Sequence, residues 1–484
     1  SSLPYSSDID LFGQGSVYQY LNRTVTPMGR QRLVDWLETP CLDAGEIQAR
    51  QESCREVSAE PDWRLNFAAS GYDAMIDSSR DNLFRWSVMP DLFMRHSLWL
   101  KFIKAWQAAA IILVIAVISG LAGYQLLILL TVVNLAITGA YIRKIGYISR
   151  LFDNSFKQLD VFKNLIRKIN DSPFSSAWIS ERINALGIGE NSAAVQIGNL
   201  HRLLGRFDSR NNILVGFVRD ALFLTDISLV IKMEMWRKNN RENISLWLDA
   251  LGDADAMNSL ATYAYNNPGY CYPHAVQDAF CLDCNGLGHP LIHPGERVCN
   301  PFSINNLQIL VVLTGANMAG KSTFLRTVGI NHVLAHMGAP VCATSYRFSP
   351  VSLITSIRTN DSLIKHESYF YAELKKLKHI VETLEKGEAV FILLDEVLKG
   401  TNSNDKLNGS RILVSKLLSL RTSGIIATHD VALGEMENEF PGKIVNRCFE
   451  AQIVDDQLVF DYKLQDGTAR NMTALFLMKQ MKIV

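Results

Sequence analysis

The chain lacks an excess of charge of either sign, since 48 lysines and arginines balance 48 aspartates and glutamates among its 484 residues. This balance gives no indication of a polyanionic partner, so any contact with DNA must come from a local patch of positive charge. Eight scattered cysteines are too few for a disulfide scaffold in so long a chain, which favours a reducing compartment. The length exceeds that of one ordinary domain, and two or three units are expected.

No signal pattern of charged, apolar and small residues opens the chain, which begins with Ser1-Ser2 rather than Met. This beginning is compatible with a processed or trimmed piece of a longer protein. Internal repeats and low-complexity tracts are also missing from the sequence. Repeat architectures are therefore not expected.

One long stretch lacks charge altogether: residues 105–142 contain no Asp, Glu, Lys, Arg or His. Gly120 and Gly123 near its middle predict two helices, about Ala105–Leu121 and Tyr124–Ile142, joined by a tight turn. Each helix would be roughly 26 to 28 Å long at about 1.5 Å per residue, close to the about 30 Å of a bilayer core. The pattern predicts a transmembrane helical hairpin.

The flanks of this stretch agree with that prediction. Cations lie on both sides of it, and aromatic residues lie near its ends: Lys101, Lys104, Arg143, Lys144 and Arg150, with Trp99, Trp106, Tyr141 and Tyr147. We therefore expect a protein anchored in a membrane through residues 105–142, with both ends of the stretch in the cytoplasm. The alternative is a hairpin buried in a soluble core of a cytoplasmic protein, which Gln107, Gln125 and Asn134 keep open.

Helical spacing of apolar residues marks residues 16–60 and 151–262, and Thr26-Pro27 is a helix-start signal. These segments predict an all-α region on both sides of the hairpin. The charged run Arg237–Glu242 is expected to be a solvated helix face rather than a phosphate-binding patch.

After Asn266-Asn267-Pro268-Gly269, short apolar runs alternate with helical patterns. The runs are Leu307–Leu313, Val390–Leu394 and Gly424–Ala427. This alternation predicts a parallel sheet covered by helices.

A glycine-rich motif follows the first of these runs and precedes a predicted helix, Phe324–His336. It reads Gly315-Ala316-Asn317-Met318-Ala319-Gly320-Lys321-Ser322-Thr323 and satisfies the pattern G-x-x-x-x-G-K-[ST]. In such a loop backbone N–H groups surround phosphate oxygens, Lys321 reaches the β and γ phosphates, and the Ser322 hydroxyl binds Mg²⁺. We predict that all nine residues of the motif bind ATP, with Mg²⁺ as the second cofactor.

The other two runs end in residues suited to hydrolysis. Asp395 and Glu396 end the second run: Asp395 is predicted to hold Mg²⁺ together with Ser322, and Glu396 to orient or deprotonate the attacking water. His429 follows the third run, where it can sense the γ-phosphate through a water. The predicted catalytic residues are thus Glu396, His429 and Lys321.

The residues around these motifs resemble the MutS family. Gly315–Thr323 is similar to that family's variant of the loop, Gly-Pro-Asn-Met-(Gly or Ala)-Gly-Lys-Ser-Thr, and only Ala316 departs from it. Leu394–Val397 and Gly400–Asp405 resemble its acidic strand and the loop that follows, although Leu398 and Lys399 stand where the family has Gly-Arg.

Weaker likenesses extend the resemblance along the chain. They involve Asp361, Ser368-Tyr369-Phe370 with Glu373, Thr428-His429, His289-Pro290 and Leu464–Ile483, and near the other end Asn22–Arg30 with Trp36-Leu37 and Ala49–Gln51. The resemblance implies that Ser368 contacts the γ-phosphate of a partner subunit, and so acts in trans. It also implies a homodimer through head-to-tail ATPase domains.

The resemblance implies an ABC-type α/β P-loop NTPase domain after an all-α, lever-like region that the transmembrane hairpin interrupts. The expected segments are 1–98 and 148–268 (helical core and lever), 99–147 (hairpin) and 269–484 (ATPase domain with a closing helical segment).

The implied function is that of a Mg²⁺-dependent MutS-like ATPase that senses damaged or mismatched duplex DNA through nucleotide-driven changes of a dimeric clamp. No Phe is followed two residues on by Glu, so the wedge that the family inserts at a mismatch has no counterpart in this sequence. The alternative is a membrane-anchored mechanical ATPase that acts on protein or membrane partners without reading DNA.

Four residues have the spacing of a zinc site: Cys271, His274, Cys281 and Cys284. Small buried thiols explain them more simply. No structural zinc is expected.

Overall fold

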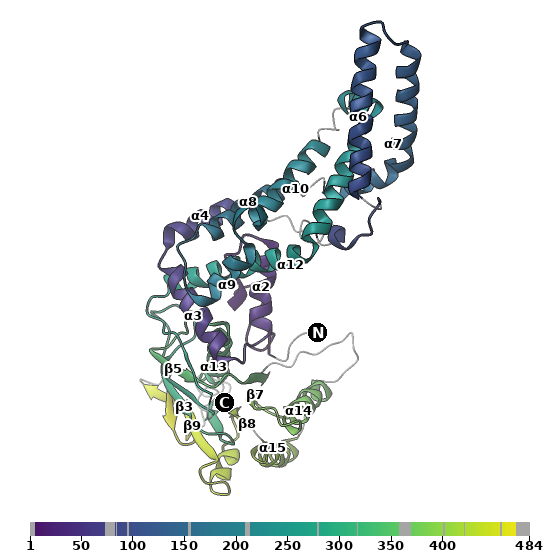
Figure 1. Cartoon of the computed structure of the whole chain (residues 1–484). Coiled ribbons are helices and arrows are strands. Elements are labelled where there is room, and N and C mark those ends of the chain that lie inside the picture. The colour runs from purple at the N-terminus through teal and green to yellow at the C-terminus, as the bar shows by residue number, and fades with distance from the viewer. Residues whose placement is uncertain are drawn as a thin grey trace. The chain divides into compact units, whose positions relative to one another are not determined.

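The computed structural model describes most of the chain, drawn in Figure 1. The described residues are 5–72, 83, 85–93, 96–152, 156–208, 213–277, 280–316, 318–357, 369–399, 402–420, 422–454 and 457–470. The chain forms two compact units: unit 1 comprises Ser1–Asn22, Leu33–Ala59 and Ser259–Val484, and unit 2 comprises Arg23–Arg32 and Glu60–Asn258. The four segments expected from the sequence stay a prediction.

Unit 1 is built on a six-stranded sheet in the order β10-β9-β4-β8-β7-β6. The strands are β4 (Leu310–Gly315), β6 (Ser352–Ser356), β7 (Val390–Asp395), β8 (Thr422–Thr428), β9 (Ile444–Val454) and β10 (Gln457–Asp466). All neighbours pair in parallel except β10, which runs antiparallel to β9. The predicted parallel sheet is confirmed, with one antiparallel edge strand added.

Helices cover both faces of this sheet. They are α13 (Lys321–Met337), α14 (Tyr369–Glu385) and α15 (Ser403–Leu418). Leu393 of β7 faces α13, since its side chain lies next to Gly329 of that helix. Its neighbours Ile392 and Leu394 point to the other face and join an apolar cluster with residues of α14 and α15. Strands buried on both faces need apolar residues at successive positions, as β7 has.

A second sheet, which the sequence analysis did not predict, has the order β1-β5-β2-β3. Its strands are β1 (His274–Ala275), β2 (Leu282–Leu287), β3 (Asn300–Ile304) and β5 (Ser345–Phe348). In this sheet the Cys284 thiol is buried and donates to the carbonyl of Phe302 at 3.1 Å. The absence of a structural zinc stays an expectation.

The beginning of the chain is part of unit 1, where α1 (Val17–Leu21) and α3 (Ala44–Ser58) lie. The buried Asp8 carboxylate accepts hydrogen bonds from the Thr355 hydroxyl at 2.8 Å and the Ile357 amide at 2.9 Å. Lys376 of α14 pairs with the same carboxylate at 3.2 Å. One buried acid thus fixes the segment around Asp8 to the sheet and to α14.

Every regular element described in unit 2 is helical, as predicted. The helices are α4 (Pro61–Gly71), α6 (His96–Ile118), α7 (Tyr124–Phe152), α8 (Phe156–Asn170), α9 (Ala177–Leu186), the short η2 (Gly189–Asn191), α10 (Ala193–Asp208) and α11 (Ile213–Phe223). Two further helices, α2 (Pro27–Glu38) and α12 (Thr225–Asn266), contribute residues to both units.

The apolar stretch forms the helical hairpin expected from the sequence, with α6 and α7 side by side in Figure 1. Both helices extend beyond the predicted bounds on their charged sides, because Lys and Arg are good helix formers and continue the helix. In each helix an 18-residue window has a mean hydropathy of 1.9, yet only 11% of the window in α6 and 6% in α7 is buried. Most of the apolar surface of the hairpin is therefore not covered by the rest of the described chain, although α11 packs against part of it.

Two of the polar side chains that argued against a membrane span have partners inside unit 2. Asn134 is fully buried, accepts a hydrogen bond from the Trp106 indole at 2.9 Å and donates to the carbonyl of Ala221. Gln107 donates to the carbonyl of Phe223 at 2.8 Å. Both acceptors belong to the last turn of α11, whose carbonyls have no partner within the helix.

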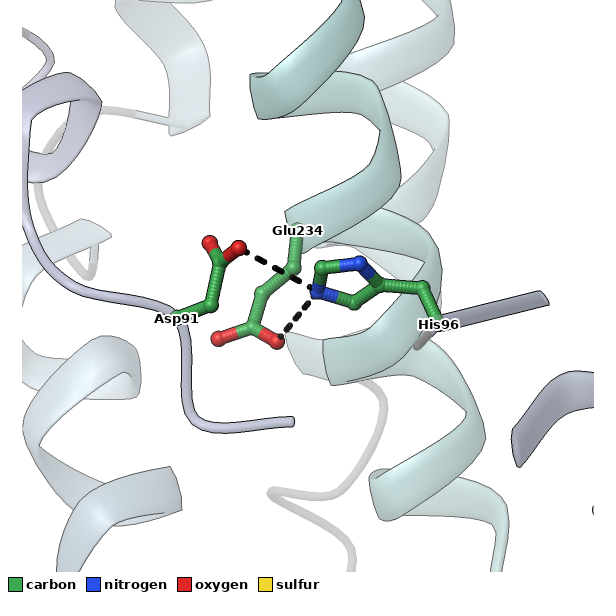
Figure 2. Close-up of side chains that lie close together, drawn as sticks. All are labelled: Asp91, His96 and Glu234. Carbon is green, nitrogen blue, oxygen red and sulfur yellow. Dashed lines mark hydrogen bonds and ion pairs between the residues drawn. The ribbon is translucent and has the colours of Figure 1, made fainter. Parts of the chain in front are cut away.

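A buried ion cluster fixes the start of α6 to α12 (Figure 2). The Glu234 carboxylate of α12 accepts the backbone amide of Leu92 at 2.6 Å and lies 3.1 Å from the His96 ring. Arg237 is buried and pairs with Asp91. The expectation of a solvated face is therefore wrong for Arg237, which pairs with Asp91 and with Glu234 of its own helix, whereas Lys238, Arg241 and Glu242 of the same run are exposed.

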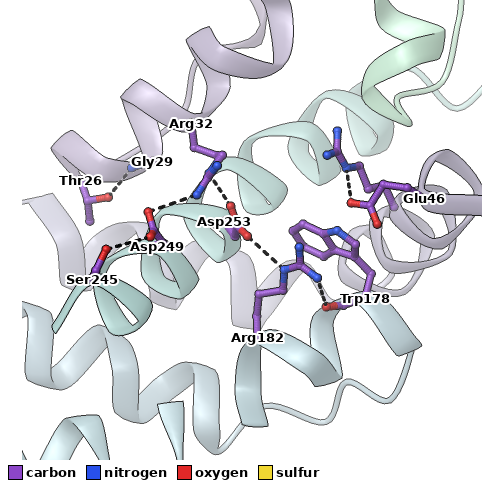
Figure 3. A network of polar contacts seen from close by, with 10 residues as sticks. Thr26, Gly29, Arg32, Glu46, Trp178, Arg182, Ser245, Asp249 and Asp253 are labelled. Carbon is purple, nitrogen blue, oxygen red and sulfur yellow. Dashed lines mark hydrogen bonds and ion pairs between the residues drawn. The ribbon is translucent and has the colours of Figure 1, made fainter. Parts of the chain in front are cut away.

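Carboxylates of α12 also hold α2 and α9 (Figure 3). Asp253 pairs with Arg32 of α2 at 2.5 Å and with Arg182 of α9 at 3.0 Å. The Arg182 guanidinium lies over the ring of Trp178, 4.0 Å from its centroid. Ion pairs shared by one acid restrict the helices more than isolated surface pairs would.

A second carboxylate of α12 fixes the start of α2. The fully buried Asp255 accepts hydrogen bonds from the amide and hydroxyl of Thr26, at 2.8 and 2.6 Å, while the Thr26 hydroxyl caps the helix by accepting the Gly29 amide at 2.9 Å. Burial raises the pKa of Asp255 to about 6, although the hydrogen bonds from Thr26 and Val25 act in the opposite direction. The predicted helix start at Thr26-Pro27 is confirmed.

This contact predicts the effect of Gly29→Ala. A Cβ at residue 29 would lie 2.2 Å from the Asp255 Oδ2, so the helix start or the carboxylate must move. We expect the free energy of unfolding to fall by about 2 kcal/mol, measured by thermal or urea denaturation. The control is Gly146→Ala in α7, where a Cβ meets nothing within 4 Å. Equal stability of the two variants would contradict the packing described here.

Candidate nucleotide-binding site

Three motifs far apart in the sequence meet at one edge of the main sheet of unit 1. Strand β8 pairs in parallel with β4 on one side and with β7 on the other. Gly315, Asp395 and Thr428 end these three strands. Because parallel strands present their carboxyl ends at the same edge, the glycine loop, the acidic pair and His429 lie together, as predicted.

The loop after β4 has a backbone that needs glycine at both ends. At Gly315 a Cβ would lie 2.9 Å from the carbonyl oxygen of Phe449, and at Gly320, with φ of 102°, it would lie 3.0 Å from the ring of Tyr462. Met318 has a φ of 73° and is 80% exposed. Such backbone angles are costly for a residue with a side chain and gather where a loop binds a ligand.

Lys321 begins α13 and points back into this loop. Its ammonium donates to the carbonyls of Gly315 at 2.7 Å and Ala316 at 2.9 Å, and the side chain is buried. Burial lowers the pKa of Lys321, against the nearby negative charges of Glu396 and Asp395. The loop thus surrounds a desolvated cation, which a phosphate would bind strongly.

Ser322 and Asp395 supply two oxygens side by side. The Ser322 hydroxyl donates to Oδ2 of Asp395 at 2.5 Å. Burial raises the pKa of Asp395, while the hydrogen bond from Ser322 and the charge of Lys399 lower it. A hydroxyl and a carboxylate oxygen are ligands that Mg²⁺ accepts, usually with water and phosphate oxygens completing the shell. These residues therefore fit the predicted metal.

Glu396 directly follows Asp395 and contacts His429. Its Oε1 is 3.1 Å from Nδ1 of His429, and its backbone, with φ of 50°, donates to the carbonyl of Ala427 at 2.8 Å. Burial raises the pKa of Glu396, but the His429 hydrogen bond and the Lys399 charge outweigh burial, so the pKa is lowered. Glu396 is thus kept ionised, as a group that orients water requires.

Glu373 of α14 shapes the turn after the acidic pair, a role that the sequence analysis missed. Its buried carboxylate accepts the backbone amide of Leu398 at 2.6 Å, and Leu398 has a φ of 61°. Burial raises the pKa of Glu373, against the hydrogen bond from Leu398. The only signal in the sequence was the position of Glu373 in the family resemblance.

A cavity of about 490 Å³ opens beside the loop. Polar residues of the motif and Glu396 line it together with the larger side chains of Ile292, Phe449 and Tyr462. His289 also lines it; burial lowers the pKa of this imidazole to about 4, and the charge of Arg326 acts in the same direction. The volume suits a small ligand with a polar and an apolar end.

The remaining motif residues are distributed as follows. Ala316, Met318, Gly320, Lys321, Ser322 and Thr323 line the cavity, and Ala319 is buried. Asn317, Ser368, Asp361, Gly400 and Thr401 lie outside the described residues. The action of Ser368 in trans stays a prediction, as do the individual roles of the other site residues.

A buried strand, a glycine loop that surrounds a lysine, the helix that follows and a carboxylate at a neighbouring strand end together define a P-loop nucleotide-binding protein. Residues 311–482 match the family model of MutS domain V, and residues 5–80 match that of MutS domain III. The chain belongs to the MutS family.

Several curated relatives carry the name DNA mismatch repair protein MutS. The one from Leptospira interrogans (strain Fiocruz L1-130) is 32% identical over 240 residues, which are 48% of this chain and 28% of the relative. The one from Thermotoga sp. (strain RQ2) is 31% identical over 221 residues, 45% of this chain and 27% of the relative. The chain thus spans less than a third of the length of the curated relatives it matches.

The geometry of the loop predicts the effect of Lys321→Ala. Removing the cation inside the loop should weaken ATP binding about ten- to hundredfold, the value of a charge-assisted hydrogen bond to phosphate. Equilibrium binding of a fluorescent ATP analogue measures the change. Lys386 is exposed and directly follows α14, so Lys386→Ala is the matched control and should bind normally. An unchanged affinity of Lys321→Ala would refute the assignment of the loop.

Proposed function

We propose that this protein is a MutS-like ATPase that binds ATP with Mg²⁺ beside α13 and hydrolyses it. The observation that carries the proposal is the meeting of Lys321, the Ser322–Asp395 pair and the Glu396–His429 pair at one sheet edge. The relatives are named for DNA mismatch repair, which supports a function of the same kind.

In this proposal each side chain has one task. Lys321 would bind the β and γ phosphates, and Ser322 and Asp395 would hold Mg²⁺, whose charge would offset negative charge on the phosphates. Glu396, ionised and aligned by His429, orients the attacking water. Ile292 and Tyr462 form an apolar wall suited to the base of the nucleotide. Ser368 of a second copy completes the site in a head-to-tail homodimer.

Nucleotide state would then control a conformational clamp on duplex DNA, so that damaged or mismatched DNA is sensed through the ATPase cycle. Binding of ATP favours the dimer in which both sites are complete, and hydrolysis releases it. This part of the proposal is supported by the family membership and by the names of the relatives.

The hairpin supports a second proposal: residues 105–142 anchor the protein in a membrane, with the ATPase on the cytoplasmic side. Large apolar side chains of α6 and α7 are exposed in the described structure, among them Ile111, Ile112, Ile115, Ile118, Leu126, Ile128, Leu129 and Val132. A surface of this kind is costly in water and suits hydrocarbon. The internal partners of Gln107 and Asn134 remove a cost that spanning would otherwise carry.

The anchor also favours an alternative for the work that ATP performs. A membrane-anchored mechanical ATPase would act on protein or membrane partners and would not read DNA. Both versions use the same nucleotide site, so they differ only in what stimulates hydrolysis.

Duplex DNA distinguishes the two versions. If the protein senses DNA, duplex DNA should raise the ATPase rate of the detergent-solubilised chain, and the stimulation should fade steeply with salt because phosphate contacts release counterions. The rate is measured by phosphate release, with Glu396→Gln as the control for contaminating ATPases. A rate that is indifferent to DNA at low salt would favour the mechanical ATPase.

Charged substitutions on the exposed face of α6 test the anchor. Ile111→Lys with Ile115→Lys should release the chain from membranes into carbonate buffer, since each Lys in hydrocarbon costs roughly 2.5 to 3.5 kcal/mol. The same change would be tolerated if this face contacted water. Ile188→Lys with Leu246→Lys is the control, because both side chains are exposed in unit 2 outside the hairpin. A wild-type chain that carbonate extracts would contradict the anchor.

A further inference from the structure

A cationic cavity in unit 2 has no part in the nucleotide site. It has a volume of about 320 Å³ and lies between α10 and α12. Its lining residues are Asn199, Arg202, Leu203, Arg206, Lys232 and Trp236. Three of these six are Arg or Lys and none is acidic. We call it the cationic cavity.

Positive charges in this cavity act on one another. Lys232 is partly buried, and burial lowers its pKa; the charges of Arg206 and Lys104 lower it further. All three influences disfavour the charged form of Lys232. An anion in the cavity would offset this repulsion, and the partly desolvated ammonium would bind it more strongly than an exposed one.

The cavity lies at the base of the apolar hairpin. Lys104, whose charge reaches Lys232, belongs to α6 and directly precedes residues 105–142. Helix α10 contacts α7, and the last carbonyls of α11 contact Gln107 and Asn134. The cations are thus found where the charge-free part of the hairpin begins.

The wall of the cavity is aromatic and aliphatic as well as cationic. The Trp236 indole donates to the carbonyl of Gln196 at 2.8 Å, which fixes the ring between α10 and α12. Trp236 and Leu203 present apolar surface beside Arg202 and Lys232. A cation next to a tryptophan suits a ligand with a charged phosphate and an attached apolar part.

A neighbouring cavity of about 330 Å³ shares Arg202 and also contains Lys163, Arg167 and His201. Its charge is partly compensated, because Asp160 pairs with Lys163 at 2.5 Å. Burial lowers the pKa of His201, although the charge of Asp160 acts in the opposite direction. The ammonium of Lys163 is therefore less available to an anion than that of Lys232.

We propose that the cationic cavity binds the phosphate headgroup of an anionic phospholipid at the membrane surface. The proposal rests on the insertion of residues 105–142, which would bring the cavity to the level of the headgroups. Duplex DNA also carries phosphates, but a groove beside the start of a hydrocarbon-facing hairpin is better placed for lipid than for a duplex. The headgroup would fix the orientation of α10 and α12 relative to the bilayer.

Lipid retention tests the proposal on the full chain purified in a neutral detergent. Native mass spectrometry after titration with phosphatidylglycerol or phosphatidylcholine gives the preference for the anionic lipid. Arg202→Gln with Lys232→Gln should reduce this preference roughly ten- to thirtyfold, since each cation near a membrane surface contributes about 1 kcal/mol. The matched control is Lys238→Gln with Arg241→Gln, which removes one Lys and one Arg at exposed positions of α12. The control should keep the preference.

Two further measurements separate the possible outcomes. Carbonate extraction of the Arg202→Gln, Lys232→Gln variant tests the anchor. This variant should remain in the membrane fraction whether or not the cavity binds lipid. Anisotropy with a labelled duplex reports on DNA. An unchanged lipid preference in the cavity variant overturns the proposal. If that variant also loses duplex binding, the cavity binds DNA rather than lipid. If carbonate extracts the wild-type chain, flotation with phosphatidylglycerol vesicles still tests the cavity, and equal flotation of the cavity variant and the control overturns it.

Discussion

The parallel pairing of β8 with both β4 and β7 is the constraint on which the candidate site depends. It brings Gly315 and Asp395 to one edge of the sheet although 80 positions separate them in the numbering. The short hydrogen bond between Ser322 and Asp395 is the direct consequence of that pairing. A sheet with another strand order would leave Lys321 without the acids that face it, and the loop would then be an unexplained turn. The glycine loop can bind phosphate alone, but hydrolysis needs the neighbouring strand.

The sequence predicts those parts of the site that have local signatures. The loop from Gly315 to Thr323 is recognisable because phosphate binding needs particular residues at fixed spacing between a strand and a helix. Tyr462 and Phe449 could not be found in this way, since they reach the cavity from β9 and β10, more than a hundred residues further along the chain. The role of Glu373 is hidden for a similar reason: a single glutamate in a helix gives no sign that it will accept the amide of Leu398.

The same distinction applies to the helical unit. A charge-free stretch of sufficient length predicts the hairpin, and the two helices are there. The burial of Arg237 could not be predicted, because one of the two acids that pair with it, Asp91, is far away in the sequence. In the sequence alone Asn134 and Gln107 count against a membrane span, whereas in the structure both side chains donate hydrogen bonds to carbonyls at the end of α11. The local sequence pattern predicts that a helix forms, but contacts with residues distant in the sequence determine the partners of its polar side chains.

Charge shows how a global property can hide a local one. The chain carries equal numbers of acidic and basic residues, so its overall field favours no anionic partner. Within unit 2, however, the charges are unevenly distributed. Asp249, Asp253 and Glu234 pair with Arg32, Arg182 and His96, whereas the lining residues of the cationic cavity include three cations and no acid. A neutral composition is therefore compatible with a local group of cations that attracts phosphate, because the total charge does not determine how the charges are distributed over the fold.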